Sequence, residues 1–198
     1  MAEASDLHAA AAAVSADLQA AGIRHAVSGS IALAAHGYVR GTADVDLLVV
    51  APALRIPTVF EIVRRHGFEG EDRALIEGLR ERKVAVLRRG PLAFEILVPA
   101  IPYHETLVDR AVWIDVAGRR VPCVSAEDLI VLKMVWSRPK DVSDVHALVA
   151  VRRGALDAAY VRRTLSSILP DRDSRLSDWD ACVRRFGGPI SDPPRGAR

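Results

Sequence analysis

The sequence predicts an α/β domain, in which helices flank a mixed central sheet, followed by a C-terminal helical segment. Strand-like apolar runs alternate with helical patterns up to about residue 124, and two pairs of strands follow each other across short turns. Beyond Ser125 only helical patterns remain. Half of the 198 residues are hydrophobic, which is enough to bury one core with a small appendage.

The elements of the first half follow from local spacing. Leu7, Ala10, Val14 and Leu18 recur at helical intervals before Gly22, and a continuous apolar run indicates a strand covered on both faces. The elements expected here are helix 6–21, strand 23–27, a turn at 28–30, helix 31–36, strand 45–50, a helix ending near 66 and helix 72–82.

The second half begins with two predicted hairpins. Strands 84–87 and 92–98 are joined across Gly90-Pro91, and strands 111–116 and 120–124 turn at Ala117-Gly118. Pro99 and Pro102 are expected to break the chain between them. Helices are expected from 125, over 140–152 and over 157–186, where the last stretch is interrupted near Pro170. We therefore divide the chain into a core (1–124), a helical segment (125–186) and a flexible tail (187–198).

The composition narrows the class of protein. A net charge of +2 is too small to indicate nucleic-acid binding by itself. Cys123 and Cys182 lack metal-ligand spacing and are expected to be buried free thiols. Residues 1–14 lack the basic start of a signal peptide, and no apolar run is long enough to cross a membrane. These features predict a cytoplasmic protein with no membrane partner.

Two carboxylates mark the first candidate site. Asp44 and Asp46 stand two residues apart at the start of an apolar strand, so both side chains leave the same face. Adjacent carboxylates repel each other unless a cation, an arginine or a proton compensates. A hard divalent ion such as Mg²⁺ meets this need with oxygen ligands. A solvated strand end is the alternative for an Asp-x-Asp pair alone.

A small-residue turn precedes the pair. Ser28-Gly29-Ser30 joins a strand to a helix and gathers backbone N–H groups, which suits an anionic phosphate. Gly29 would let a phosphate approach the main chain, and Ser30 would add a hydroxyl donor. An ordinary tight turn with a helix cap is the alternative. Together, the turn and the carboxylate pair predict a metal–nucleotide site.

These motifs resemble those of the nucleotidyltransferase superfamily with the polymerase-β-like fold. Its pattern is Gly-Ser or Gly-Gly, a helix, and then Asp-x-Asp, matched here by residues 27–49. The stretch is close to that of minimal bacterial members, including AbiEii-type toxin-like proteins. Residues 125–148 also resemble the helical part of that group, so the likeness covers roughly residues 20–150.

The resemblance implies roles for particular residues. Asp44 and Asp46 would bind one or two Mg²⁺ ions, while the Ser28–Ser30 turn would hold the nucleotide phosphates. Glu95, in an apolar strand, would be the third metal-binding and catalytic carboxylate. The family usually has Asp at that point and commonly has Gly where this chain has Ser28. An outward-facing residue on an alternating edge strand is the alternative for Glu95.

Four further residues are candidates for nucleotide binding, namely Arg40, Thr42, Lys133 and Asp141. Arg40 would neutralise a phosphate or Asp44, and Thr42 would hydrogen-bond the loop and orient the pair; a solvated loop arginine and an ordinary turn threonine are the alternatives. Lys133 lies on an apolar helix face and would either reach the rim or contact a phosphate. Asp144 is expected to pair with Lys140 and Arg138 or to cap its helix, and the same role is the alternative for Asp141.

The resemblance implies an Mg²⁺-dependent transfer of a nucleoside monophosphate from a nucleoside triphosphate to a hydroxyl. The acceptor would be RNA, a protein or a small molecule, and the chain would take part in a toxin–antitoxin pair or in phage defence. The partners would be the nucleotide, the acceptor and a cognate toxin or antitoxin. The alternative, suggested by Glu95 and Ser28, is a catalytically inactive module that keeps the fold for binding or regulation.

Overall fold

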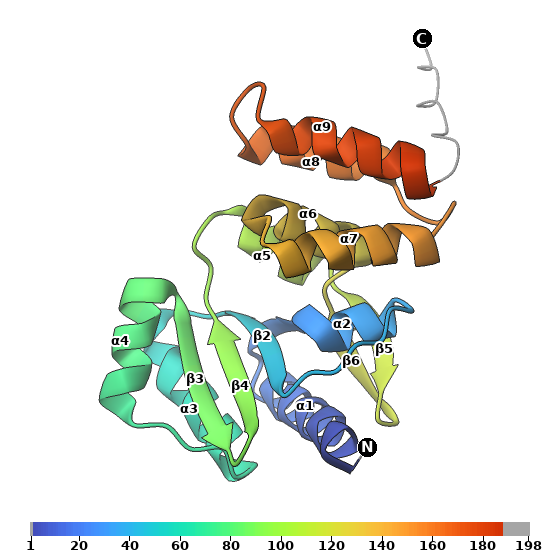
Figure 1. The fold of residues 1–198 in the computed structure, drawn as a ribbon. Coiled ribbons are helices and arrows are strands. Elements are labelled where there is room, and N and C mark those ends of the chain that lie inside the picture. Colours follow the sequence, from blue (N-terminus) through green and yellow to red (C-terminus); the bar gives the residue numbers. More distant parts are fainter. Residues whose placement is uncertain (1, 188–198) are drawn as a thin grey trace. The chain divides into compact units, whose positions relative to one another are not determined.

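The computed structural model describes residues 2–187 and divides into two compact units. The first unit comprises the residues up to Ala35 and Val39–Ser125; the second comprises His36–Tyr38 and the residues from Ala126 onward. The first unit contains, in order (Figure 1), α1 (Ala2–Ala20), β1 (Arg24–Val27), α2 (Gly29–Ala35), β2 (Asp44–Val50), the 3₁₀ turn η1 (Ala53–Arg55), α3 (Ile56–Arg65), α4 (Asp72–Arg82), β3 (Val84–Arg89), β4 (Leu92–Leu97), α5 (Tyr103–Asp109), β5 (Val112–Val116) and β6 (Arg119–Cys123).

The sheet of the first unit is six-stranded and mixed, in the order β3-β4-β2-β1-β6-β5. β2 pairs parallel with β4 and antiparallel with β1, whereas β3–β4 and β5–β6 are antiparallel hairpins. β1 pairs parallel with β6. β2 and β4 are therefore interior strands, which excludes the expectation that Glu95 of β4 lies on an edge strand. The predicted α/β class with a mixed central sheet is confirmed.

Helices cover both faces of this sheet. His25 of β1 hydrogen-bonds Ser15 of α1 and stands opposite Val49 of β2, so α1 covers the face of Val49. Asp46 leaves β2 on the other face, because its position differs from Val49 by an odd number of residues. There its carboxylate meets Gly29, so α2 covers that second face. The candidate carboxylates thus lie on the α2 side of the sheet.

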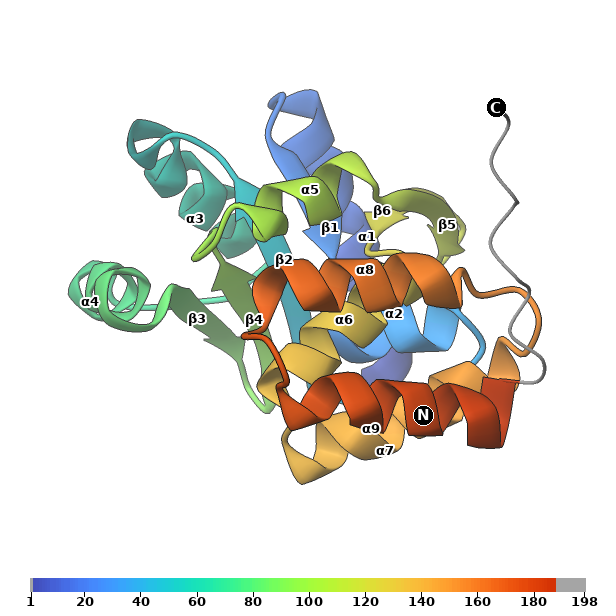
Figure 2. The ribbon, with the colours of Figure 1, turned by 90° about the horizontal axis from the view of Figure 1, so that it is seen from above.

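The order of the predicted elements agrees with the structure, with one addition. Residues 103–109 form α5, whereas Pro99 and Pro102 were expected only to break the chain. Pro102 is instead the residue that caps α5, a position where the fixed φ of proline suits a helix start. α4 lies beside β3 in both views (Figures 1 and 2).

The second unit is helical. It contains α6 (Ala126–Trp136), α7 (Pro139–Val151), α8 (Ala158–Ile168), α9 (Ser174–Cys182) and the π-helical turn η2 (Val183–Gly187). α6 packs against α7 and α8, and α8 lies side by side with α9 (Figure 2). Trp179 of α9 is fully buried in this unit. The predicted flexible tail, 187–198, lies outside the described residues except for Gly187.

Two expectations from composition can be compared with the structure. Both cysteines are free and buried, as expected, and burial raises the pKa of the Cys123 thiol to about 12 and that of Cys182 to about 11. Among the described residues, none of the helices combines the length and apolarity that a membrane span requires. The division of the chain into a core and a helical appendage stays a prediction.

Candidate functional site

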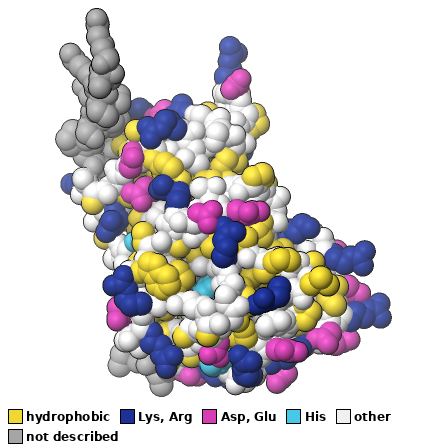
Figure 3. Space-filling view, turned by 180° about the vertical axis from the view of Figure 1, so that it is seen from behind, with side chains coloured by type: hydrophobic (Ala, Val, Ile, Leu, Met, Phe, Trp, Pro, Cys, Tyr) yellow, Lys and Arg dark blue, Asp and Glu magenta, His cyan; other side chains and the backbone are white. Residues whose placement is uncertain are grey.

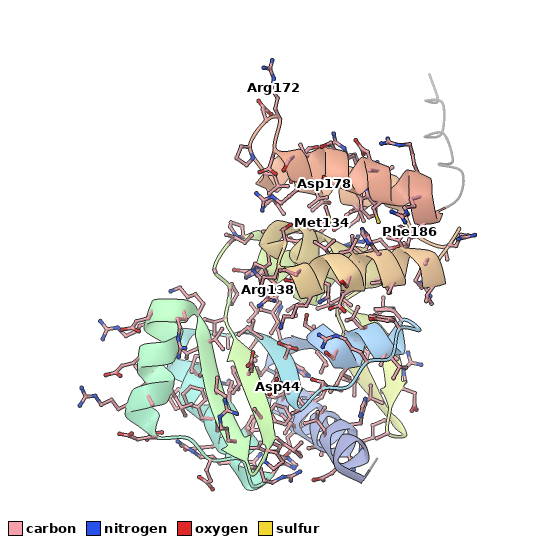
Figure 4. The ribbon with its side chains drawn as sticks, in the orientation of Figure 1. Asp44, Met134, Arg138, Arg172, Asp178 and Phe186 are labelled. Carbon is pink, nitrogen blue, oxygen red and sulfur yellow. The ribbon has the colours of Figure 1, made fainter. Side chains whose placement is uncertain are left out.

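Asp44 and Asp46 lie at the start of β2 in the first unit (Figure 4). Both side chains are half-buried and leave the same face of the strand, whereas Val45 between them is fully buried on the other face. The apolar half of β2 therefore anchors the strand in the core. The same packing holds the two carboxylates at the border between core and solvent.

Gly29 is in contact with Asp46. A Cβ atom built on Gly29 would lie only 1.7 Å from Oδ2 of Asp46, so this carboxylate occupies the space of the missing side chain. Gly29 also has a φ of +58°, in the left-handed region that glycine adopts without strain. A backbone hydrogen bond of 2.8 Å from Ser28 N to Asp46 O fixes the turn to the strand. The two sequence motifs thus form one site.

The turn itself is mostly buried. Ser28 and Ser30 are 8% and 4% exposed, and Ala32 N donates to Ser28 O at the start of α2. Gly29 and Ser30 therefore contribute the first backbone N–H groups of the helix, which have no partner within a helix. The sequence predicted such a group of backbone N–H donors at the start of this helix, an arrangement suited to a phosphate.

Thr42 and Arg40 belong to the segment before β2. The Thr42 hydroxyl donates to Asp44 O (3.1 Å) and accepts from Asp44 N (3.2 Å), so it binds the backbone of the first carboxylate residue. Ala93 N of β4 donates to Ala43 O between them. Arg40 is half-buried in the same segment. Thr42 therefore holds the main chain of Asp44, and its predicted role in orienting the carboxylate pair stays a prediction.

Glu95 stands directly opposite Asp46 on the parallel neighbour β4. Partners in register on adjacent strands point to the same face, so Glu95, Asp44 and Asp46 share the α2 face of the sheet. Glu95 is half-buried, and Val86 of β3 is its partner on the other side. The sequence predicted that Glu95 lies on a strand. Its place directly beside Asp46 depends on the pairing of β2 with β4, which only the tertiary structure shows.

The carboxylate oxygens of Asp44 and Asp46 suit a hard cation such as Mg²⁺. Asp44 and Asp46 offer only carboxylate oxygens, and Mg²⁺ is typically bound by one or two carboxylates that act together with substrate phosphates and water. Within residues 2–187, no cluster of three or more His, Cys, Asp or Glu side chains is close enough to hold a metal by protein ligands alone. Asp44, Asp46 and Glu95 thus do not form a three-carboxylate metal cluster in this part of the chain, and a metal bound by the first two would need further ligands from water or a substrate.

The second unit holds the remaining two candidates, Lys133 of α6 and Asp141 of α7. Lys133 Nζ lies 2.6 Å from Asp144 Oδ2 and 3.4 Å from Asp141 Oδ1, and its side chain is 7% exposed. The guanidinium of Arg138 binds Asp141 through Nε at 2.6 Å and through a second contact at 3.3 Å. Arg138 precedes α7 (Figure 4). These four residues form an ion network in which Lys133, Asp141 and Asp144 are buried and Arg138 is exposed.

The network departs from one expectation. Lys133 does not reach the rim, because it is buried and its Nζ lies 2.6 Å from Asp144 Oδ2, a pairing not predicted from the sequence. Burial acts to raise the pKa of Asp141, but hydrogen bonds from Arg138 and the charges of Lys133 and Arg138 outweigh it and hold that pKa below its usual value. A lone lysine on an apolar helix face, followed by two aspartates on one face of the next helix, was the available signal for this pairing.

The family follows from a comparison with known sequences. Residues 8–177 match the family described as "Nucleotidyl transferase of unknown function (DUF2204)". The chain belongs to this family. All candidate site residues, from Ser28 to Asp141, lie within the matched range of this DUF2204 chain. A sequence search of curated proteins finds no match.

Solved structures agree on the fold of the DUF2204 chain. The solution structure of the antibiotic-resistance factor ANT(2'')-Ia is 17% identical with a TM-score of 0.55, covering 90% of this chain and 97% of that one. The crystal structure of ANT(2'')-Ia in complex with adenylyl-2''-tobramycin is 18% identical with a TM-score of 0.51, covering 85% and 94%. The predicted nucleotidyltransferase fold is confirmed, and the likeness to AbiEii-type proteins stays a prediction.

Proposed function

We propose that this chain is an Mg²⁺-dependent nucleotidyltransferase that transfers a nucleoside monophosphate from a nucleoside triphosphate to a hydroxyl group. The observation that carries the proposal is the contact between Gly29 and the Asp46 carboxylate. It joins a turn suited to phosphate and a carboxylate pair suited to a metal in one site. Membership of a nucleotidyl transferase family supports the reaction class.

In this mechanism, backbone N–H groups of Gly29 and Ser30 bind the β- and γ-phosphates. Asp44 and Asp46 would hold Mg²⁺, and the bound ion would supply positive charge against the triphosphate and the leaving pyrophosphate. Thr42 keeps Asp44 in place through its two hydrogen bonds to the Asp44 backbone. Arg40 contributes positive charge toward the same phosphates.

Glu95 is the general base of the proposal. Its carboxylate accepts the proton of the acceptor hydroxyl, whose oxygen then bonds to the α-phosphorus. The bond between the α-phosphorus and the bridging oxygen of the β-phosphate breaks, and pyrophosphate leaves with that electron pair. The position of Glu95 opposite Asp46 supports this role, because the base and the metal ligands then share one face of the sheet.

The test is isothermal titration of the full chain with each of the four nucleoside triphosphates and Mg²⁺, followed by an assay of labelled-nucleotide transfer. We expect one triphosphate to bind and Asp46→Asn to abolish Mg²⁺-dependent binding and transfer. Asp178→Asn is the matched control, because Asp178 is an exposed carboxylate of α9. The absence of binding by any triphosphate would contradict the proposal, and binding without transfer would favour the inactive module.

For the acceptor, we favour a small-molecule hydroxyl compound. The fold of this chain covers 97% of the solution structure of ANT(2'')-Ia, a protein whose crystal structure is known in complex with adenylyl-2''-tobramycin. In that protein, a chain of about this length is sufficient to bind such a compound. The transfer assay is run in parallel with tobramycin, with total RNA and with purified protein. Label on RNA or protein alone would contradict the choice of acceptor while leaving the reaction class intact.

We also propose that this chain acts as one member of a toxin–antitoxin pair. This part of the proposal is supported by the resemblance of residues 27–49 and 125–148 to AbiEii-type proteins. Induced expression is expected to arrest bacterial growth, and Asp46→Asn is expected to relieve the arrest. Growth that is equally slow with the Asp46→Asn protein would contradict a toxic activity of this site.

A further inference from the structure

A large pocket opens in the first unit at the opposite end of β2 from the carboxylates. Its volume is about 1090 Å³, and Val50, the last residue of β2, lines it. At about 3.3 Å per residue, Val50 lies about 20 Å along the strand from Asp44. The pocket is therefore separate from the proposed nucleotide site, and pockets of roughly 300–1,000 Å³ hold small molecules.

Two helices form walls of the pocket. α4 contributes Asp72, Ile76, Leu79 and Arg80, and Lys83 follows directly after this helix; α3 contributes residues 56, 57, 60, 61 and 64. Within each helix these positions recur three or four residues apart, so each helix turns one face toward the pocket. The α4 face begins with Asp72, which pairs with Arg64, is apolar at Ile76 and Leu79, and ends on Arg80. Ile76 is 52% exposed although it is large and apolar.

The charges of the lining favour an anion. Five basic side chains and three acidic ones line the pocket. Arg64 is paired with Asp72, Arg24 is paired with Asp109, and Arg55 donates a hydrogen bond to Ala21 O. Arg80 and Lys83, by contrast, have no ion-pair partner among residues 2–187, and both stand in the last turn of α4 or just beyond it. Figure 3, which views the molecule from behind, shows hydrophobic side chains interspersed with basic and acidic ones.

We propose that this pocket binds a small amphiphilic anion. Its apolar body packs against Phe60 of α3 and against Ile76 and Leu79 of α4, where burial of hydrocarbon provides the driving force. Its carboxylate or phosphate group binds Arg80 and Lys83, since guanidinium and ammonium groups both form charge-assisted hydrogen bonds with such anions. Glu61 and Glu105 line other parts of the pocket and direct the anionic group to the α4 side.

The test is isothermal titration of the full chain with decanoate and decyl phosphate, with inorganic phosphate, decanol and decyltrimethylammonium as comparison probes. We expect saturable binding of one equivalent of decanoate or decyl phosphate. The double variant Arg80→Gln/Lys83→Asn is expected to weaken binding at least tenfold; asparagine is chosen because residue 83 has a φ of 60°. Ile76→Asp, at an exposed position, is a second variant with the same expected direction.

Two matched controls separate this site from the nucleotide site and from general surface charge. Arg73→Gln removes a basic residue of α4 that pairs with Glu77 and does not line the pocket, and Asp46→Asn disables the proposed metal site. Both are expected to bind decanoate as the unmodified chain does. The proposal is overturned if neither amphiphilic anion binds, if decanol, phosphate or the cationic amphiphile binds as tightly, or if the double variant and Ile76→Asp leave the affinity unchanged.

Discussion

The Asp46 carboxylate lies in the space that a side chain on Gly29 would fill, with 1.7 Å between its Oδ2 atom and the position of a Cβ. No substitution of Gly29 can therefore leave Asp46 where it is. The two residues are 17 positions apart in sequence, yet each fixes the place of the other.

Gly29→Ala is expected to displace the Asp46 carboxylate and to strain the backbone at a φ of +58°. The strain alone is worth about 1–2 kcal/mol, and displacement of a metal ligand by about 1 Å would lower transfer about 100-fold. Thermal unfolding and the transfer assay measure both effects. Gly41→Ala is the matched control, since a Cβ there meets nothing within 4 Å. Equal activity of both variants would contradict the prediction.

Glu95→Gln is expected to lower transfer by about 100-fold or more, because removal of a general base has that effect. Nucleotide binding should change little, since the amide is nearly the same size. The activity of Glu95→Asp should lie between that of the unmodified chain and that of Glu95→Gln, because the carboxylate is kept on a shorter side chain. A pH–rate profile distinguishes the roles: loss of the acidic limb in Glu95→Gln supports a base. An unchanged profile and rate would exclude Glu95 from proton transfer.

Lys133→Met is expected to destabilise the second unit by about 3–5 kcal/mol, because it leaves buried carboxylates without their cation. The effect should be partly reversed in Lys133→Met/Asp144→Leu, which removes the pair that is 2.6 Å apart. Urea unfolding followed by tryptophan fluorescence measures the free energies. Arg162→Met is the comparison: its ion pair with Asp180 is partly exposed and worth about 1 kcal/mol or less. Similar losses in Lys133→Met and Arg162→Met would contradict the prediction.

The Asp141 carboxylate is expected to make stability fall in acid. Burial would raise its pKa, but Arg138 and Lys133 hold the pKa below the ordinary value of 3.8. The folded state therefore binds the proton less readily than the unfolded state, and the stabilisation is fully present above about pH 4 and is lost as the pH falls through the folded pKa. The free energy of unfolding, measured with urea between pH 5 and pH 2, should vary less steeply with pH in Asp141→Asn than in the unmodified chain. An equal pH dependence of the two proteins would contradict the prediction.

His25 is expected to stay neutral in the folded protein. Burial lowers its pKa below 6.5, while Nδ1 donates to Ile23 O (2.9 Å) and Nε2 accepts from the Ser15 hydroxyl (2.8 Å). Its contribution to stability is therefore fully present above about pH 6.5 and is lost as the pH falls from there through the folded pKa. An NMR titration of the imidazole should give a pKa below 6.5. A value at or above 6.5 would contradict this assignment.

The sequence by itself determined the elements and the two motifs of the candidate site. Apolar spacing predicted β2 and α2, the alternation of side chains in a strand placed Asp44 and Asp46 on one face, and the small residues at 28–30 predicted the turn. These features are local, since the residues that specify them lie within one or two turns of helix or one strand. The helix α5 was not recognised, because Pro102 can end one element and begin the next.

Only the tertiary structure decided which distant residues share a surface. The parallel pairing of β2 with β4 puts Glu95 beside Asp46, and the packing of α6 on α7 closes Lys133 onto Asp144. The basic end of α4 becomes part of a pocket only because α3 turns a matching face toward it. Strand register and helix packing depend on how many side chains fit together in one core, a requirement that no short stretch of sequence contains.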